Sequence, residues 1–139
     1  MKALLKKHES KLRFAFVGGF NTLLDFALLF LFTNLGVNKF AANYISTSVA
    51  FVFSFFANRS FTFKSKGSMK KQIVPFLVVT LSGLWIIQPV IIWLATQPLN
   101  ALITNDAIVL FIAKLLATVA SLIWNYIFYS RFVFTDARG

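Results

Sequence analysis

Two ionisable side chains lie inside long apolar stretches, and they have the strongest potential for chemistry in this sequence. Asp25 ends the stretch "VGGFNTLLD" (residues 17–25), with Asn21 one helical turn before it. Lys114 lies within "FIAKLLATVA" (residues 111–120). Ionisable residues are costly inside a bilayer, and those that occur there pair with one another or mark the path of a substrate, ion or proton. Asp25 and Lys114 are therefore the first candidates for a polar site.

The residue types that most enzyme chemistry needs are scarce. The chain has no cysteine, and its single histidine, His8, lies in a basic N-terminal segment. Thiol catalysis, disulfides and cysteine-ligated metal sites are therefore excluded. The sequence also lacks a Ser/His/Asp combination, a pair of neighbouring carboxylates and a glycine-rich phosphate loop. We therefore expect a protein that is not an enzyme and that needs no metal ion or cofactor.

The composition indicates a membrane protein. Of the 139 residues, 58% are hydrophobic and 13% are charged, and 18 are phenylalanines. A soluble domain would have about a quarter charged residues. Four apolar runs reach the ~20 residues that a helix needs to cross a ~30 Å hydrocarbon core. The sequence thus predicts an all-α integral membrane protein with a single four-helix transmembrane domain over residues 1–139. The predicted spans are residues 14–33, 42–61, 73–96 and 107–129.

Basic residues are distributed unevenly around these spans. Of the 14 lysines and arginines, twelve lie in the N-terminal segment, in the loop between the second and third spans, or in the C-terminal segment. Lys39 is the only base on the opposite side, and Lys114 lies within a span. The positive-inside rule then places both termini in the cytoplasm. This basic face would attract anionic lipids, and because no nucleic-acid-binding fold is visible, we expect no nucleic-acid partner.

The second and fourth spans repeat one another at an offset of 71 residues. They end in the similar stretches "SFFANRSFTF" (residues 54–63) and "NYIFYSRFVF" (residues 125–134). The same offset pairs small or hydrogen-bonding residues at every fourth position, which form a ridge that lets membrane helices approach closely. The chain is therefore predicted to form two repeated helical hairpins. The paired positions are Ala42 with Ala113, Ser46 with Ala117, Ala50 with Ser121, and Ser54 with Asn125.

Glycines and prolines predict further local features. Gly18 and Gly19 belong to small-xxx-small spacings that are typical of close helix packing. Pro89, near the middle of the third span, would remove one backbone hydrogen bond and kink the helix. Pro98 lies beyond the predicted span and is expected to mark its end.

The depths of Asp25 and Lys114 predict that the two residues meet. At 1.5 Å per residue, Asp25 lies about 16 Å from the inner start of its span, and Lys114 lies about 10 Å below the outer surface. In a core of ~30 Å these depths differ by about 4 Å, which a lysine side chain can cover. We therefore predict an Asp25–Lys114 pair, or a shared polar pocket, that joins the hairpins. A purely structural ion pair that fixes helix packing is the alternative.

Other polar residues extend this predicted pocket. Asn21 lies on the stripe of the acid, and Asn125 lies on the helix of the base. Together they would line a crevice suited to a negatively charged headgroup whose hydrocarbon tail stays in the bilayer. Arg59 and Arg131, at the cytoplasmic ends of their helices, would offer forked donors to a phosphate. The alternative role of both arginines is to anchor the helices at the membrane surface.

Four stretches of the sequence, in order, resemble the GtrA-like family of small four-helix membrane proteins: "RFAFVGGFNTLLDF", "FANRSFTF", "AKLLATVASLIWNY" and "SRFVF". The resemblance covers nearly the whole chain. The family often has an Asn-Arg pair at the end of helix four, where this chain has "YSRFVF", so the pair Asn58–Arg59 that closes helix two is the better match. The resemblance implies a multi-pass protein of the bacterial cytoplasmic membrane. It also implies movement of a polyprenyl-phosphate-linked sugar to the outer leaflet, where membrane glycosyltransferases would use it for a cell-surface polysaccharide.

Three functions fit these residues. The first is translocation of a polyprenyl-phosphate-linked sugar, and the second is a non-transporting scaffold that anchors a polyprenyl-phosphate glycosyltransferase. The third is a small proton-coupled multidrug exporter, which the one-sided charge and an intramembrane lysine disfavour. Because four helices hardly enclose a path for a sugar, we expect a homo-oligomer. The predicted substrate-binding residues are Asn21, Asp25, Asn58, Arg59, Lys114, Asn125 and Arg131.

Overall fold

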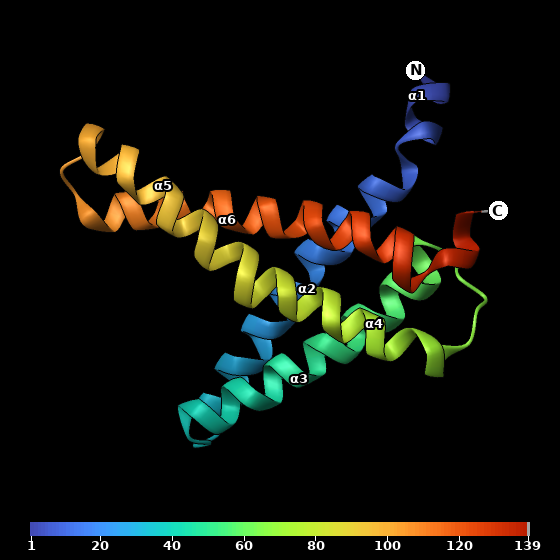
Figure 1. Cartoon of the computed structure of the whole chain (residues 1–139). Coiled ribbons are helices and arrows are strands. Elements are labelled where there is room, and N and C mark those ends of the chain that lie inside the picture. Colours follow the sequence, from blue (N-terminus) through green and yellow to red (C-terminus); the bar gives the residue numbers. More distant parts are fainter. Residues whose placement is uncertain (139) are drawn as a thin grey trace. The chain divides into compact units, whose positions relative to one another are not determined.

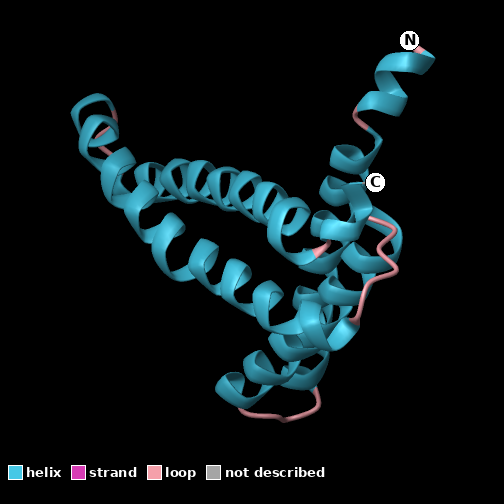
Figure 2. Ribbon diagram, turned by 45° about the vertical axis from the view of Figure 1, so that its right-hand side comes forward, coloured by secondary structure: helices cyan, strands magenta, loops and turns pink. Residues whose placement is uncertain are grey.

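The computed structural model describes residues 1–138, which form helices joined by short loops and contain no strand (Figures 1 and 2). The predicted all-α fold class is confirmed. Four helices are long and apolar enough to cross a membrane, and each predicted span lies within one of them: Glu9–Asn34, Lys39–Thr62, Met69–Leu102 and Asp106–Val133. The elements in chain order are α1 (Lys2–Lys7), α2 (Glu9–Asn34), α3 (Lys39–Ala57), the π-helical turn η1 (Asn58–Thr62), α4 (Met69–Ser82), the π-helical turn η2 (Gly83–Ile87), α5 (Gln88–Leu102), α6 (Asp106–Phe128), the π-helical turn η3 (Tyr129–Val133) and the 3₁₀-helix η4 (Thr135–Arg138).

The chain divides into two compact units, residues 1–66 and residues 67–138. In the first unit, α2 packs along α3, and in the second, α5 packs along α6 (Figure 1). Tight connections explain both hairpins. Gly36 takes a left-handed φ of 90° after α2, and the Asn38 side chain accepts a hydrogen bond from the Phe40 N–H to cap α3. Asn105 caps α6 in the same way, by accepting from the N–H groups of Ala107 and Ile108.

The predicted ridge of small residues is buried in both units. In α3, Ala42, Ser46 and Ala50 are each 4% exposed or less. Their counterparts in α6, 71 positions later, are each 5% exposed or less. Side chains of this size allow close helix contact, which is the main source of packing energy between helices in lipid. The counterparts are Ala113, Ala117 and Ser121.

The repeat also extends into the backbone. The turns η1 and η3 begin at Asn58 and Tyr129, which are 71 positions apart, and each turn is five residues long. A buried phenylalanine follows each turn: the Phe63 N–H donates to the Asn58 carbonyl at 2.9 Å, and the Phe134 N–H donates to the Tyr129 carbonyl at 2.8 Å. Hydropathy alone does not predict these π-helical turns. Such turns are rare in proteins, and those that occur often lie at functional sites.

The first membrane-spanning helix of each unit buries corresponding residues. Phe14 and Val17 are buried in α2, and Phe76 and Val79, 62 positions later, are buried in α4. The two units therefore place an aromatic and an aliphatic side chain at equivalent points of their first helix.

The third span differs from the first span, which is its counterpart in the first unit. The π-helical turn η2 interrupts the third span, whereas α2 is continuous. The interruption lies directly before Gln88 and Pro89. Pro89 has no N–H for the carbonyl four residues earlier, and a π turn accommodates that loss.

Two local predictions need correction. Pro98 does not end the third span, because α5 continues to Leu102; proline is tolerated inside membrane helices when neighbouring groups satisfy the freed carbonyl. A Cβ added to Gly19 would meet no atom within 4 Å, so no described helix of the first unit packs closely on that glycine. The close approach occurs at Gly83 instead, where an added Cβ would lie 2.8 Å from Asn125 Oδ1 and 2.9 Å from Ser121 Oγ.

Candidate substrate-binding site

Helix α2 holds two polar side chains that lack partners. Asn21 and Asp25 are both half-buried, and the Oδ1 atom of each is buried without a hydrogen-bond partner among the described residues. Their neighbour Thr22 is different, because its hydroxyl donates to the Gly18 carbonyl at 3.0 Å. A buried acceptor without a donor costs about 1–3 kcal/mol. The stripe predicted from the sequence therefore contains two acceptors that an external donor would stabilise.

The turn η1 holds a second pair of this kind. Asn58 is 2% exposed and Thr62 is 3% exposed, and they lie four residues apart. The Asn58 Nδ2 group donates to the Ser54 carbonyl at 2.9 Å and to Ser54 Oγ at 3.2 Å. Asn58 Oδ1 and Thr62 Oγ1 have no partner within residues 1–138. The sequence predicted Asn58 but missed Thr62, although its place one turn after Asn58 in "NRSFTF" is a signal that could have identified it.

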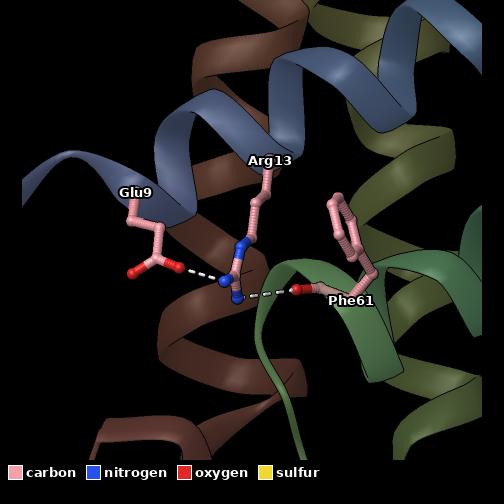
Figure 3. A network of polar contacts seen from close by, with 3 residues as sticks. All are labelled: Glu9, Arg13 and Phe61. Atoms are coloured by element: carbon pink, nitrogen blue, oxygen red, sulfur yellow. Dashed lines mark hydrogen bonds and ion pairs between the residues drawn. The ribbon is translucent and has the colours of Figure 1, made fainter. Parts of the chain in front are cut away.

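Arg13 holds the η1 turn against the start of α2 (Figure 3). Its guanidinium pairs with the Glu9 carboxylate and donates to the Phe61 carbonyl at 3.3 Å. The guanidinium carbon also lies 5.3 Å from the centre of the Phe61 ring, within cation–π range. The sequence predicted Arg13 only as one of the basic residues of the cytoplasmic face. The spacing of Glu9 and Arg13, one helical turn apart, was the available signal for its structural role.

The predicted site arginines lie on the two equivalent turns. Arg59 is the second residue of η1 and is half-buried, whereas Arg131 on η3 is exposed. An apolar groove of about 310 Å³ lies on the first unit beside η1. It is lined by Phe16, Val17, Phe20, Phe53, Ala57 and Phe61.

Lys114 in the second unit has a partner that the sequence did not predict. Its Nζ donates to Gln88 Oε1 at 3.0 Å, across the α5–α6 hairpin. Gln88 follows η2 directly, so the interruption of the third span positions this amide. The amide is neutral, so this bond within the second unit does not compensate the charge of Lys114. The Asp25–Lys114 pair would join the two units and stays a prediction.

Asn125 lies where α6 approaches η2. Its Oδ1 is buried and has no hydrogen-bond partner among the described residues, and the bare Cα of Gly83 leaves the room that this side chain occupies. One residue earlier, Trp124 Nε1 donates to Ser82 Oγ at 2.9 Å, which ties α6 to the end of α4. Asn125 is therefore held in a packed position with a free acceptor.

The turn η3 has no free polar group at the position equivalent to Asn58. Tyr129 is 2% exposed, and its hydroxyl is hydrogen-bonded to the Thr80 hydroxyl. Its ring stacks on Phe76 with 4.9 Å between the ring centres. The Tyr129 side chain is therefore buried, stacked and hydrogen-bonded in this turn.

Comparison with known proteins adds the family. The family model described as "GtrA/DPMS, transmembrane domain" matches residues 13–134. The chain belongs to this family. It is also similar to the uncharacterized membrane protein YngA of Bacillus subtilis (strain 168), with 33% identity over 135 residues, 96% of this chain and 85% of that protein. The family resemblance predicted from the sequence is thus confirmed, and this member of the GtrA/DPMS family is a multi-pass membrane protein.

Most of the buried side-chain atoms without a partner among the described residues of this GtrA/DPMS-family chain are hydrogen-bond acceptors. Four of the five unpartnered buried atoms are amide or carboxylate oxygens, which can only accept hydrogen bonds. Any group that bonds one of these oxygens must be a donor, such as a hydroxyl. Lys114, whose partner within its own unit is a neutral amide, can pair with an anion. The five atoms belong to Asn21, Asp25, Asn58, Thr62 and Asn125.

Proposed function

We propose that the protein translocates a polyprenyl-phosphate-linked sugar across the bacterial cytoplasmic membrane, for the synthesis or modification of a cell-surface polysaccharide. The single observation that carries the proposal is the set of buried, unpartnered acceptor oxygens within membrane-spanning helices. Sugar hydroxyls are hydrogen-bond donors, and a sugar bound there would satisfy acceptors that hydrocarbon cannot. Membership of the GtrA/DPMS family is consistent with this substrate class.

The phosphate of the substrate has its own candidate partners. Arg59 and Arg131 offer guanidinium forks at the equivalent ends of α3 and α6. Lys114, bonded to the neutral Gln88, offers a cation at membrane depth. The apolar groove beside η1 would accept the first part of the hydrocarbon chain. In this proposal the protein binds and moves its substrate without chemistry, and therefore needs neither a cofactor nor a metal ion.

The proposal includes the surroundings of the protein. Both termini face the cytoplasm, where the basic residues contact anionic lipids. A membrane glycosyltransferase delivers or uses the lipid-linked sugar. A second copy of the chain completes the enclosure of the sugar, since four helices alone offer little room.

Reconstitution tests the proposal. The purified full chain is placed in liposomes with a labelled polyprenyl-phosphate sugar, and transfer between leaflets is followed by quenching of the outer label. We expect transfer faster than in protein-free liposomes, and the Asp25→Ala and Lys114→Ala variants to lose it while inserting normally. Asp106→Ala and Lys70→Ala, which remove exposed charges outside the candidate site, are the matched controls. Equal transfer with and without protein would refute translocation.

A second candidate function is a scaffold for a polyprenyl-phosphate glycosyltransferase. The description of the matching family model, which names a DPMS transmembrane domain beside GtrA, favours it. A scaffold would leave transfer in liposomes at the protein-free rate and would still co-purify with a membrane glycosyltransferase. Accelerated transfer by the purified chain alone separates the translocase from the scaffold.

A further inference from the structure

A second groove lies at the far end of the first unit, where α2 ends and α3 begins. Its volume is about 430 Å³, larger than that of the groove beside η1. Its lining also differs, because the groove beside η1 has only apolar residues and this one combines three apolar with three polar residues. We call it the Lys39 groove. It is lined by Leu29, Phe30, Thr33, Lys39, Phe40 and Asn43.

The apolar part of the Lys39 groove is formed by exposed aromatic rings. Phe30 is 63% exposed and Phe40 is 78% exposed, and Leu29 completes this part of the lining. Such rings fit a hydrocarbon chain, which they would contact without any polar group to desolvate.

The polar part presents one cation beside an amide and a hydroxyl. The Lys39 ammonium has three donors and a positive charge. The Thr33 hydroxyl donates to the Leu29 carbonyl at 2.7 Å, so its free lone pairs can only accept. Lys39 is also the first residue of α3, a helix of 19 residues whose positive dipole end favours an anion at this point. The polar part therefore matches an anion that carries hydroxyl groups.

The position of Lys39 supports this match. Of the 14 basic residues, Lys39 is the only one that lies on its side of the predicted topology, and it lines the groove. The positive-inside rule needs no base on that side. Membrane topology therefore does not account for this residue, whereas an anionic ligand does.

We propose that the Lys39 groove binds the phosphate headgroup of an isoprenoid phosphate lipid in the outer leaflet, as the release site of the translocated substrate. Lys39 pairs with the phosphate, Asn43 bonds a phosphate or sugar oxygen, and the first isoprene units lie against Phe30 and Phe40. This inference rests on the proposed function for the direction of transport. Binding of the lipid to the groove can be tested separately.

Photolabelling tests the binding. The full chain in lipid nanodiscs is labelled with a polyprenyl monophosphate that carries a photoreactive group near the phosphate, and the adducts are located by peptide mass spectrometry. We expect adducts within residues 29–43, reduced about tenfold by Lys39→Gln because a charge-assisted contact is lost. Lys39→Arg keeps the charge and should keep the adducts. Lys70→Gln, which removes an exposed base at the start of α4, should leave them unchanged.

Two competitors decide the source of the phosphate. Unlabelled polyprenyl phosphate should remove the adducts at residues 29–43, whereas phosphatidylglycerol at the same concentration should not. Equal competition by phosphatidylglycerol, or adducts that do not depend on Lys39, would overturn the proposal.

A transport measurement separates the two proposals. In liposomes where the wild-type chain accelerates transfer, Lys39→Gln should slow it by about tenfold, the effect of one lost ionic contact. A wild-type chain without transfer refutes the proposed function and leaves Lys39-dependent labelling as evidence of binding. Transfer by Lys39→Gln at the wild-type rate refutes the release site and leaves the proposed function intact.

Discussion

The turns η1 and η3 have the same backbone and opposite side-chain chemistry. In η3, the Tyr129 hydroxyl bonds Thr80 and the ring stacks on Phe76, so every polar group at the key position is satisfied. In η1, the equivalent Asn58 keeps a buried oxygen without a partner. The two units therefore share a local backbone geometry, but only the first leaves a buried hydrogen-bond acceptor at this position, Asn58 Oδ1, without a partner among the described residues.

The first helices explain part of this difference. At the offset of 62 residues that relates Phe14 to Phe76, the residue equivalent to Thr80 is Gly18. The second unit thus has a hydroxyl for its turn, and the first unit has a glycine that offers none. The two units therefore differ at two equivalent positions, one on each helix of the hairpin.

The largest expected effect comes from removing the free oxygen of η1. Asn58→Leu should lower transfer of a labelled polyprenyl-phosphate sugar in liposomes by up to about a hundredfold, because a buried substrate hydroxyl left without its acceptor costs about 1–3 kcal/mol. Tyr129→Phe, the matched change in η3, should keep transfer within about twofold of the wild-type rate. Equal loss in both variants would show that the two turns do the same work.

Copying the polar turn into η3 should damage stability instead. The double variant Tyr129→Asn and Val133→Thr gives η3 the side chains of η1, but it removes the stacked ring and leaves buried polar groups beside Thr80. We expect the free energy of unfolding to fall by about 3 kcal/mol, as for other losses of buried aromatic rings. Denaturant titration of the detergent-solubilised chain measures this fall. A variant as stable as the wild type would mean that the stacking and hydrogen bonding of Tyr129 do not stabilise the second unit.

Arg13 should have an intermediate effect, because it positions η1 and belongs to the first unit only. Arg13→Gln removes the ion pair with Glu9 and weakens the bond to the Phe61 carbonyl. We expect faster amide hydrogen exchange over residues 58–63 and a loss of transfer of about tenfold, since misplacement of a binding group is costly. Glu9→Gln is the control, because one exposed ion pair is worth only about 0.2–1 kcal/mol. Unchanged exchange over these residues would remove Arg13 from the positioning role.

Gly18→Ser should have the smallest effect and sharpens the comparison most. A serine hydroxyl at this position would correspond to Thr80 and would be free to donate to the Asn58 oxygen in η1, whereas Thr80 donates to the Phe76 carbonyl and accepts from Tyr129. We expect a stability gain of about 1 kcal/mol, the usual net value of a hydrogen bond, and a loss of transfer of several-fold because the acceptor is occupied. Gly19→Ser, one residue away on an exposed face, is the control. A gain in transfer would contradict the role of the free oxygen.

Much of the fold could be predicted from the sequence, because the controlling physics is local. Hydropathy runs locate the four spanning helices, since a bilayer requires every backbone group to be satisfied within its own segment. The offset of 71 residues identifies the hairpin repeat and the buried ridge of small residues. The helix interruption before Pro89 was predicted as a kink and is a π-helical turn.

The site could be predicted only in part. Asn21, Asp25, Asn58 and Asn125 stand out as polar residues in apolar surroundings, and each has a buried atom without a partner. Gln88 was missed as the partner of Lys114, because its reach depends on how α5 lies against α6. Thr62 and Arg13 were also missed, since one looks like an ordinary turn residue and the other like part of a basic segment.

The sequence by itself determined the helices, their repeat and the one-sided charge, because hydrophobic length, small-residue spacing and lysine and arginine placement act through the bilayer rather than through particular contacts. Only the tertiary structure decided which polar groups are satisfied. Asn58 and Tyr129 occupy equivalent positions, but the Tyr129 hydroxyl finds Thr80 on α4, whereas Asn58 Oδ1 has no partner among the described residues. Hydrogen bonds need donor and acceptor within about 3 Å, and that proximity arises when helices pack.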